Sequence, residues 1–171
     1  DIDAINNTSK APSGWNVNSG SGGLIDLPAA SSISTITNNT VVTVGSLTDI
    51  TQTGDRNNPG TFEFDALNNV IAADKVQMNA GGAVALAKGV STINAKINNA
   101  SVNIGDGAVL QSLGDVAMGA RAAGDISTTV AVDVYGLAGA PIGSSTSNFI
   151  ADNQINIGDA TELLALQDVV L

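Results

Sequence analysis

The feature of this chain that most constrains its fold is an internal repeat. The segment VNIGDGAVLQSLGDVAM at residues 102–118 is identical to INIGDATELLALQDVVL at residues 155–171 at eight of seventeen positions. An upstream segment, NNTVVTVGSLTDITQTGD at residues 38–55, aligns without a gap with residues 98–115, and both end in Gly-Asp. The offsets between copies are 60 and then 53 residues. Such long-period self-similarity is typical of proteins built by stacking equivalent units.

Apolar and polar residues alternate through and between the copies, which is the pattern of β-strands. Val102 and Ile104 form one such run, and Ile126 to Val134 another. Runs of about four to eight residues predict short strands, each ended by Gly, Asn or Asp. The sequence predicts no substantial helix, because even ATELLALQD at residues 160–168 aligns with a strand copy. The fold class is therefore all-β.

Two all-β architectures fit short strands with frequent corners: a sandwich and a parallel β-solenoid. Hairpin signals are scarce, and the interior is supplied by Ala, Val, Ile and Leu with only three Phe, one Trp and one Tyr. Small and β-branched side chains suit a narrow core between stacked strands, which favours the parallel β-solenoid, or β-helix. With roughly twenty residues per coil, we expect about eight coils and a stack ~40 Å long at a strand spacing of ~4.8 Å.

The repeats predict two regions. Residues 38–171 hold the solenoid repeats and end in the middle of a repeat, with excursions from the coil at residues 53–61 and 136–148. Residues 1–37 do not follow the repeat, and residues 11–37 are rich in Pro, Ser and Gly. We interpret 1–37 as an N-terminal extension or linker; the alternative is a segment packed on the solenoid or on a neighbouring subunit.

Composition limits the classes of partner and chemistry. The net charge of −10 argues against nucleic acid as a partner. The chain has no Cys and no His, which excludes thiolate or imidazole metal sites and a Ser-His-Asp triad. No apolar run is long enough to span a bilayer, so no membrane insertion is expected. A Cys-free, acidic chain rich in Asn and Thr is typical of exported bacterial proteins.

Gly-Asp pairs recur where alternating runs end. We interpret them as corners in which Gly takes a positive φ and Asp caps the turn. The alternative is a Ca²⁺ site, because carboxylate oxygens are ligands of this ion; the candidates are Asp106, Asp115, Asp125 and Asp159. The Asp residues are spaced apart rather than clustered, so we expect no bound cofactor and assign the pairs as structural corners: Gly105, Asp106, Gly114, Asp115, Gly124, Asp125, Gly158 and Asp159.

An enzyme is the natural alternative for a β-helix, because paired carboxylates in a cleft cleave glycosidic bonds. The candidates for such a site are Asp49, Asp55, Arg56, Glu63 and Asp65. The chain has six Lys plus Arg and almost no aromatic surface for a sugar, so we expect no catalytic residues and no enzymatic activity.

The pattern at residues 102–120, its partial copy at residues 155–171, and AAGDISTTVAVDVYGLAG at residues 122–139 resemble a known family. They are similar to the right-handed β-helical repeats of secreted bacterial haemagglutinin-like adhesins and leukotoxin-type giant exoproteins, over about two thirds of the chain. The resemblance implies a right-handed parallel β-helix and an elongated, exported rod used in attachment. Residues 1–37 lie outside it.

These observations predict a non-enzymatic structural segment of an extracellular, cell-surface adhesin or fibre. Its partners would be other repeats and a host or matrix receptor or glycan. One alternative is a subunit that assembles head to tail into a filament through open solenoid ends, with Trp15, Leu24 and Leu171 as candidate contacts. A third is a module that binds or degrades polysaccharide.

Overall fold

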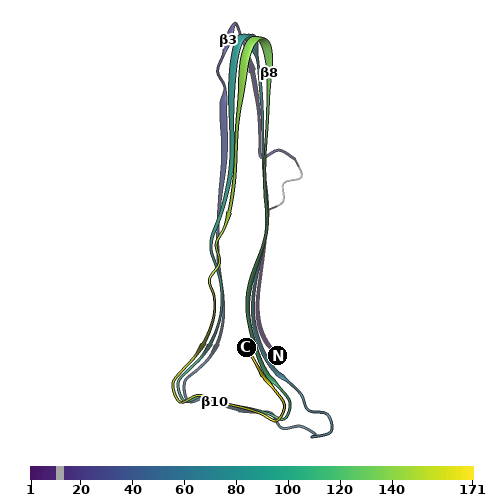
Figure 1. Cartoon of the computed structure of the whole chain (residues 1–171), viewed down its shortest axis with the longest axis vertical. Helices are drawn as coiled ribbons and strands as arrows, with labels where there is room; N and C mark the ends of the chain where they lie inside the picture. Colours follow the sequence, from purple (N-terminus) through teal and green to yellow (C-terminus); the bar gives the residue numbers. More distant parts are fainter. Residues whose placement is uncertain (11–13) are drawn as a thin grey trace.

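The computed structural model of this protein describes residues 1–10 and 14–171, and these are organised almost entirely as β-strands. Figure 1 shows two long arms that meet in a bend at the top and are joined at the bottom by a short cross-piece. The expected all-β class is confirmed, and no helix is found in the described ranges. The strands are β1 (Ile2–Lys10), β2 (Val17–Gly22), β3 (Ile25–Asp26), β4 (Ala29–Val44), β5 (Asp49–Thr51), β6 (Phe62–Ile104), β7 (Val109–Ser112), β8 (Val116–Phe149), β9 (Asn153–Ile157), β10 (Glu162–Ala165) and β11 (Val169–Val170).

The chain travels the same path several times, and each strand pairs in parallel with the strand one repeat later. β1 to β4 pair with β6, which pairs in turn with β8 and β9. The cross-piece is a separate sheet with the order β10-β7-β5. We call residues 2–61 the first pass, 62–115 the second and 116–168 the third; β11 starts a further pass beside Val116 and Ala117.

The register of these pairs is the one that the sequence repeats predict. Asn38 lies beside Asn98, as in the upstream alignment. Val102 lies beside Ile155, as in the downstream alignment. The repeat therefore records which residues are neighbours in adjacent strands.

The expected length of one pass is wrong. Equivalent residues are 53 residues apart at the corner Asp106/Asp159 and 62 apart at Asn7/Asn69, so the chain makes about three passes rather than eight. Three passes at a strand spacing of ~4.8 Å give a stack only ~14 Å deep. The strands are long because bends do not interrupt pairing: β6 has 43 residues and continues through Gly81 and Gly82 at the top of the arms.

Residues 1–37 are not separated from the repeats. β1 pairs with residues 64–72, β2 with residues 76–81, and the continuous strand β4 crosses the expected boundary at residue 37. These residues therefore form strands of the sheet instead of a linker; the part of the predicted loop at residues 11–13 lies outside the described residues.

The two predicted excursions have different outcomes. Residues 53–61 leave the strand path and form a small turn in which Asp55 and Asn58 bridge, as expected. Residues 136–148, in contrast, belong to β8 and pair with residues 82–94 of β6. Their Gly, Ala and Ser residues gave no strand signal, yet the pairing of the backbone with β6 holds them in the sheet.

The core is a thin layer between the two arms and is divided into three clusters of small apolar side chains. The upper cluster is centred on Val76 and Met78, the middle cluster on Val70 and Ile93, and the lower cluster on Val102 above the cross-piece. Two polar layers interrupt this core. Asp74 and Ser91 lie between the upper and middle clusters, while Asn68, Asn98 and Thr40 lie between the middle and lower clusters.

One irregularity in β6, in the arm that follows the bend at Gly81 and Gly82, changes which alternate side chains face the core. Buried positions are odd-numbered down to Ala95 and even-numbered from Asn98 onward. Ile97, between them, has a φ of 58°, and the pairing with β4 shifts register between Ile36 and Asn38. An extra residue in a strand has this effect, because it moves every later side chain to the other face.

Candidate functional site

The corners between the long arms and the cross-piece repeat the same residue arrangement from pass to pass. Gly45, Gly105 and Gly158 occupy the same place in successive passes. A Cβ on Gly105 would lie 2.5 Å from the Ser46 nitrogen, so only Gly allows the adjacent backbones to approach this closely. Asp106 accepts a hydrogen bond on its Oδ1 from the Asp159 N–H at 2.9 Å. This pair joins the second pass to the third.

The positive φ of the corner lies elsewhere than expected. Leu47, Gly107 and Ala160 have φ values of 56°, 66° and 56°. They occupy equivalent places two residues after each corner Gly, and only one of them is Gly. The predicted role of Gly105 and Gly158 as positive-φ residues is therefore wrong; they are needed for close packing of neighbouring passes.

The second corner, after the cross-piece, uses the same device. Asp115 accepts a hydrogen bond on its Oδ1 from the Asp168 N–H at 3.0 Å. Gly114 packs against the backbone of Gly60, so Gly60 is its structural counterpart in the first pass. The alignment of Gly54-Asp55 with this corner is wrong, because that pair lies in the excursion at residues 53–61.

The Gly124-Asp125 pair is not a corner. Both residues lie inside β8, paired with Val70 and Ile71 of β6. A Cβ on Gly124 would meet the ring of Phe149, which packs against the middle cluster. Here Gly provides space for an aromatic ring, a role that the recurrent Gly-Asp pattern concealed.

The four candidate calcium ligands are distributed over different parts of the molecule. Asp106 and Asp159 meet at one corner, Asp115 lies at the other, and Asp125 is exposed on β8. Within residues 1–10 and 14–171, no three His, Cys, Asp or Glu side chains converge as a metal site. Asp106 and Asp115 instead accept backbone hydrogen bonds from the next pass.

The five candidate catalytic residues engage in separate local contacts. Asp65 forms an exposed ion pair of 3.5 Å with Arg121, and Asp55 accepts a hydrogen bond from the Asn57 N–H at 2.9 Å. Asp49 is exposed on β5, and Glu63 is exposed near the start of β6. Arg56 borders a shallow groove beside the cross-piece whose other walls are mostly apolar, with Leu113, Leu163, Leu164, Leu166 and Val169.

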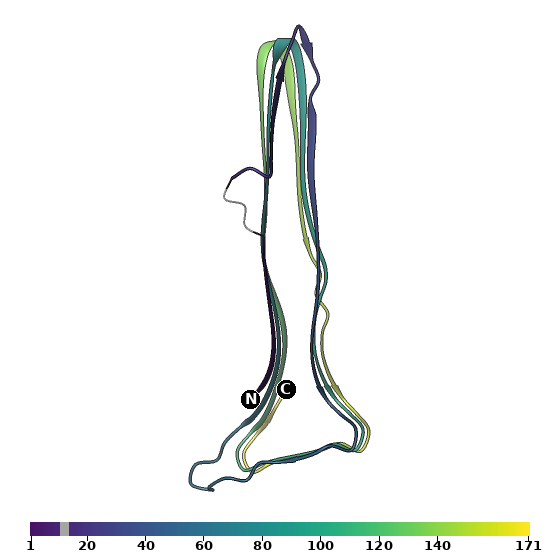
Figure 2. The ribbon, with the colours of Figure 1, turned by 180° about the vertical axis from the view of Figure 1, so that it is seen from behind.

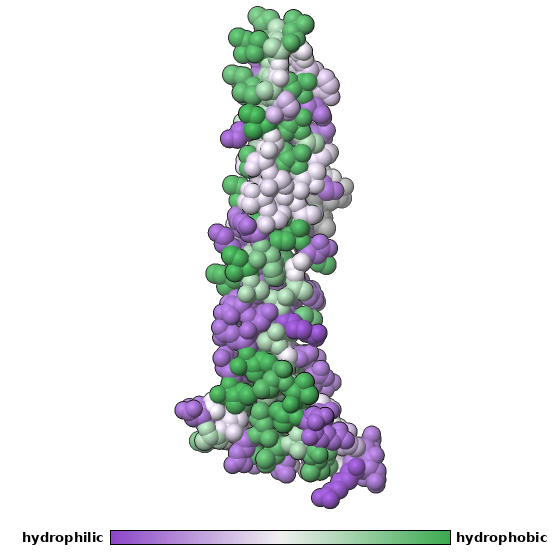
Figure 3. Space-filling model, viewed as in Figure 1, coloured by the Kyte–Doolittle hydropathy of each residue, from purple (hydrophilic) through white to green (hydrophobic). Residues whose placement is uncertain are grey.

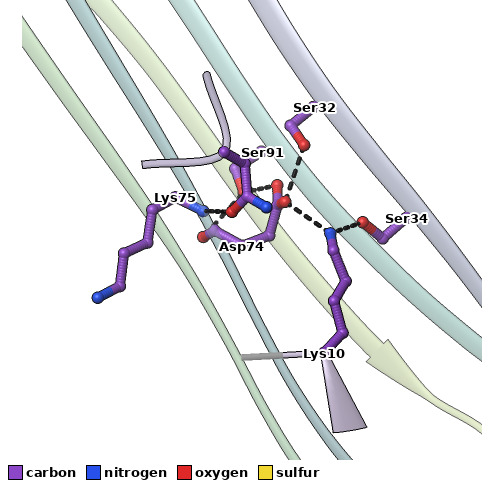
Figure 4. Close-up of polar contacts among 7 residues, drawn as sticks. Lys10, Ser32, Ser34, Asp74, Lys75 and Ser91 are labelled. Atoms are coloured by element: carbon purple, nitrogen blue, oxygen red, sulfur yellow. Dashed lines mark hydrogen bonds and ion pairs between the residues drawn. The ribbon is translucent and has the colours of Figure 1, made fainter. Parts of the chain in front are cut away.

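The upper polar layer is a buried network around Asp74 (Figure 4), whose side chain is 0% exposed. Ser91 donates to its Oδ2 at 2.7 Å, Ser32 to its Oδ1 at 2.8 Å, and Lys10 Nζ to Oδ1 at 2.9 Å. Lys10 also bonds Ser34. Burial raises the pKa of Asp74, but the hydrogen bonds from Ser91, Lys10 and Ser32 and the charge of Lys10 outweigh it and hold this pKa below its usual value.

The sequence analysis missed this network. The sequence signal for it is an Asp at a position where the alternation calls for a buried apolar side chain. Asp74 stands between Ala72 and Val76, in a stretch where every second side chain lies in the core. A charged residue at such a position needs hydrogen-bonding partners. Lys10, Ser32 and Ser91 supply them from three strands that the sequence alone did not bring together.

The lower polar layer is less well satisfied. The amide oxygen and nitrogen of Asn68, Oδ1 of Asn98 and Oγ1 of Thr40 are buried without a hydrogen-bond partner among the described residues. Asn98 does donate from Nδ2 to the Ile150 carbonyl at 3.2 Å. Asn38 and Thr8 bond each other at 2.8 Å in the first pass. Polar side chains thus face one another across the core here.

The three candidate assembly residues are all on the surface. Trp15 is 40%, Leu24 78% and Leu171 65% exposed. Figure 3, which looks onto the third pass, shows apolar side chains gathered over the lower part of this end of the molecule. The exposed apolar residues on this side near the cross-piece are Ile157, Leu164 and Leu166 of the third pass and Val169 and Val170 of β11.

None of the described residues belongs to a helix long and apolar enough to cross a lipid bilayer. No protein-family model, curated protein or solved structure matches the chain.

Proposed function

We propose that this chain is a structural, non-enzymatic segment of an extracellular bacterial surface adhesin or fibre, folded as a right-handed parallel β-solenoid. The observation that carries the proposal is the stacking of sequence repeats on one another: Gly105-Asp106 lies against Gly158-Asp159, with a side-chain to backbone bond between them. Parallel strands joined by long connections favour right-handed paths, which supports the proposed hand.

The mechanism of such a segment is mechanical. Strands of the second pass are paired on both sides, by the first and third passes. The core beneath them is built from small side chains, and the exterior is acidic, which keeps an elongated structure soluble. Because each pass contacts only its neighbours, passes can be added without changing those already present. A long rod that holds an attachment site away from a cell needs this property.

The architectural part of the proposal is tested by duplicating residues 62–115. A solenoid accepts the second copy as an additional pass, so we expect small-angle scattering to show a particle about 5 Å deeper with unchanged height. The same insert in scrambled order is the control. Loss of β-structure, or a second separate body, in the duplicated chain would count against the solenoid.

The functional part of the proposal is tested by locating the protein on cells and by measuring what the chain binds. Antibodies against the purified chain should label the surface of intact cells that produce the parent protein, and beads coated with the chain should report its attachment to host or matrix components. Labelling only after permeabilisation would contradict the proposal. Saturable binding of one saccharide on a glycan array, abolished by substitution of Arg56 beside the apolar groove, would favour the polysaccharide-binding alternative.

A further inference from the structure

Large apolar side chains gather at the bend where the two arms meet. Figure 3 shows apolar surface at this end of the molecule, and Figures 1 and 2 show from opposite sides that all three passes turn there. We call this surface the apolar tip. Its side chains are between 38% and 95% exposed, and they come from the first pass (Leu24 and Leu27), the second (Val84 and Leu86) and the third (Tyr135 and Leu137).

The apolar tip faces sideways out of the stack, so its exposure does not depend on how the stack continues. Val84 pairs with Ile25 of the first pass on one side and with Ala138 of the third pass on the other. Although it has a neighbour on both sides, Val84 is 50% exposed, and Leu86 in the same strand is 38% exposed. These two residues alternate with buried ones, which places them on the outer face of the arm that follows the bend.

The end of the molecule around the bend also lacks the negative charge of the rest of the chain. It is formed by residues 16–30, 75–89 and 129–143, which hold two Asp and two Lys and so have no net charge. The whole net charge of −10 therefore lies below this end. The corner at Gly105 is about 70 Å along the strand from Val84, far beyond the ~10 Å over which exposed charges act at moderate ionic strength.

Neither Asp of this end lies on the apolar face. Asp26 is 7% exposed, and its carboxylate accepts hydrogen bonds from the Ser21 hydroxyl and the Gly81 N–H. Asp133 pairs with Asn79 in the arm that precedes the bend, on the opposite outer face. The apolar face is thus free of exposed carboxylates.

A lysine stands directly below the apolar tip on the same face. Val84, Leu86 and Lys88 are alternate residues of β6, so they follow one another away from the bend in steps of ~7 Å. Lys88 is exposed between Ala29 and Ile142 of the neighbouring passes, and no ion pair involves it in the part of the chain that the structure describes. This spacing lets the apolar side chains enter the outer ~10 Å of a lipid bilayer while the ammonium group meets the headgroup phosphates.

We propose that the apolar tip binds the surface of a lipid bilayer, with Leu24 and Leu137 among the acyl chains and Lys88 at the level of the phosphates. Leu24 and Leu137 are 78% and 95% exposed at the bend, and they gain free energy when lipid removes them from water. Tyr135 combines an apolar ring with a hydroxyl group, which suits the boundary between lipid and water. This contact is additional to the proposed structural role and does not depend on it.

The shape of the apolar tip favours lipid over a second copy of the chain as its occupant. The exposed side chains project both from the bend and from the outer face below it. A fluid lipid layer covers both surfaces at once, whereas the flat outer face of another sheet covers only one of them. The phosphates of the lipid also supply the anionic partner that Lys88 lacks.

The first experiment is flotation of the purified chain with phosphatidylcholine vesicles. The double variant with Leu24→Asp and Leu137→Asp should lower the partition coefficient at least about tenfold, because two apolar side chains lose their burial in lipid. Leu47→Asp is the matched control at the cross-piece, where Leu47 is 84% exposed, and it should leave the partition coefficient unchanged. Circular dichroism of each variant verifies the fold.

A second pair of variants tests the role of the lysine, with phosphatidylserine added to the vesicles. Lys88→Glu should lower the partition coefficient about tenfold, because a charge that the anionic surface attracts is replaced by one that it repels. Lys96→Glu makes the same change about 26 Å further along β6, beyond the range of the surface charge, and should have a much smaller effect.

The third measurement reports the environment of the apolar tip directly. The chain has no Cys, so one introduced cysteine can carry a fluorophore whose emission depends on the polarity around it. With phosphatidylcholine vesicles, the emission of a label on Leu137→Cys should move to shorter wavelength, whereas that of a label on Leu47→Cys should not. This measurement decides the question if the double Asp variant fails to fold.

The proposal is overturned if the parent chain does not float with the vesicles, if Leu47→Asp weakens binding as much as the double variant at the apolar tip, or if both labels respond alike. Sedimentation velocity without vesicles tests the other occupant. Self-association of the parent chain that the double variant abolishes, together with no binding to vesicles, would assign the apolar tip to a second copy and overturn the lipid contact.

Discussion

Asp106 accepts a hydrogen bond from the backbone N–H of Asp159, a residue 53 positions later in the chain, at a distance of 2.9 Å. The bond spans two passes, and its geometry depends on Gly105 and Gly158, whose missing side chains let the passes touch. A Gly-Asp pair is thus a connector between repeats: Gly sets the separation, and Asp links the backbones. This explains why the pair recurs at both ends of the cross-piece.

The connector predicts that the candidate Asp residues differ in their contribution to stability. Asp106→Ala and Asp115→Ala each remove an acceptor of a backbone N–H, so each should lower the free energy of unfolding by about 1 kcal/mol. Asp125→Ala removes a similar charge from an exposed strand position and should change it by less than about 0.5 kcal/mol. Urea denaturation followed by circular dichroism measures all three. Equal losses at the three positions would show that charge, rather than the connector, matters.

The residue two places after each corner Gly has a positive φ, so Gly should be more stable than Ala at each of these equivalent sites. Gly107→Ala should destabilise the chain by about 1 kcal/mol, because its φ of 66° is unfavourable for a residue with a side chain. Ala160→Gly should stabilise it by up to about 1 kcal/mol, since Ala160 has a φ of 56°. Thermal unfolding of the two variants is the measurement. A loss of stability in Ala160→Gly would contradict the shared role.

Much of the fold follows from the sequence because neighbouring passes carry similar residues. The pairs Asn38/Asn98 and Val102/Ile155 were identified by alignment alone, and the structure has both. The length of a pass was already present in the offsets of 60 and 53 residues. The Gly and Asn residues within each unit resemble strand ends and therefore suggest a shorter pass, whereas pairing with β6 keeps the backbone extended through them.

The sequence could not give the polar layers. Lys10 reaches Asp74 from β1, the neighbouring strand of the same arm, whereas Ser32 reaches it from the opposite arm, because the two arms are in contact across a thin core. Gly124 carried the corner pattern but lies in a strand, since the Phe149 ring requires space there. Local composition identifies which residues allow a turn, whereas tertiary contacts decide which of them make one.

The lower polar layer predicts an unusual stabilising substitution. Asn68 is buried, and no described residue bonds either of its amide atoms, so Asn68→Leu, which has a similar size, should raise the free energy of unfolding by about 1 kcal/mol. Asn98→Leu should lower it, because the bond from Nδ2 to the Ile150 carbonyl is lost. Guanidinium titrations of the pair give both values. Destabilisation by Asn68→Leu would mean that its amide is satisfied in solution.

The positive φ of Ile97 predicts a second substitution that stabilises the folded chain. A β-branched residue at a φ of 58° is strained, and its side chain is exposed, so little packing opposes a substitution. Ile97→Asn should raise the melting temperature, since Asn tolerates the left-handed region. Ile71→Asn, at another exposed position with ordinary strand geometry, is the matched control and should lower it. The variants are compared by calorimetry, and a lower melting temperature for Ile97→Asn would refute the strain.

The upper polar layer predicts a specific dependence of stability on pH. The pKa of Asp74 is lower in the folded chain than in the unfolded one, so the unfolded state binds the proton more readily. The stabilisation is fully present above the ordinary Asp pKa and is lost as the pH falls toward and through the lowered folded value. At neutral pH, Asp74→Asn should cost about 3 kcal/mol, because it leaves Lys10 without its buried partner.

The decisive comparison is the difference in unfolding free energy between the parent chain and Asp74→Asn as a function of pH. We expect this difference to be constant near neutral pH and to shrink in acid, because protonation removes the same charge that the substitution removes. Asp125→Asn is the control, since its carboxylate lies exposed on β8. A difference for Asp74→Asn that stays the same down to the most acidic pH at which the chain folds would show that the charge of Asp74 does not contribute to stability.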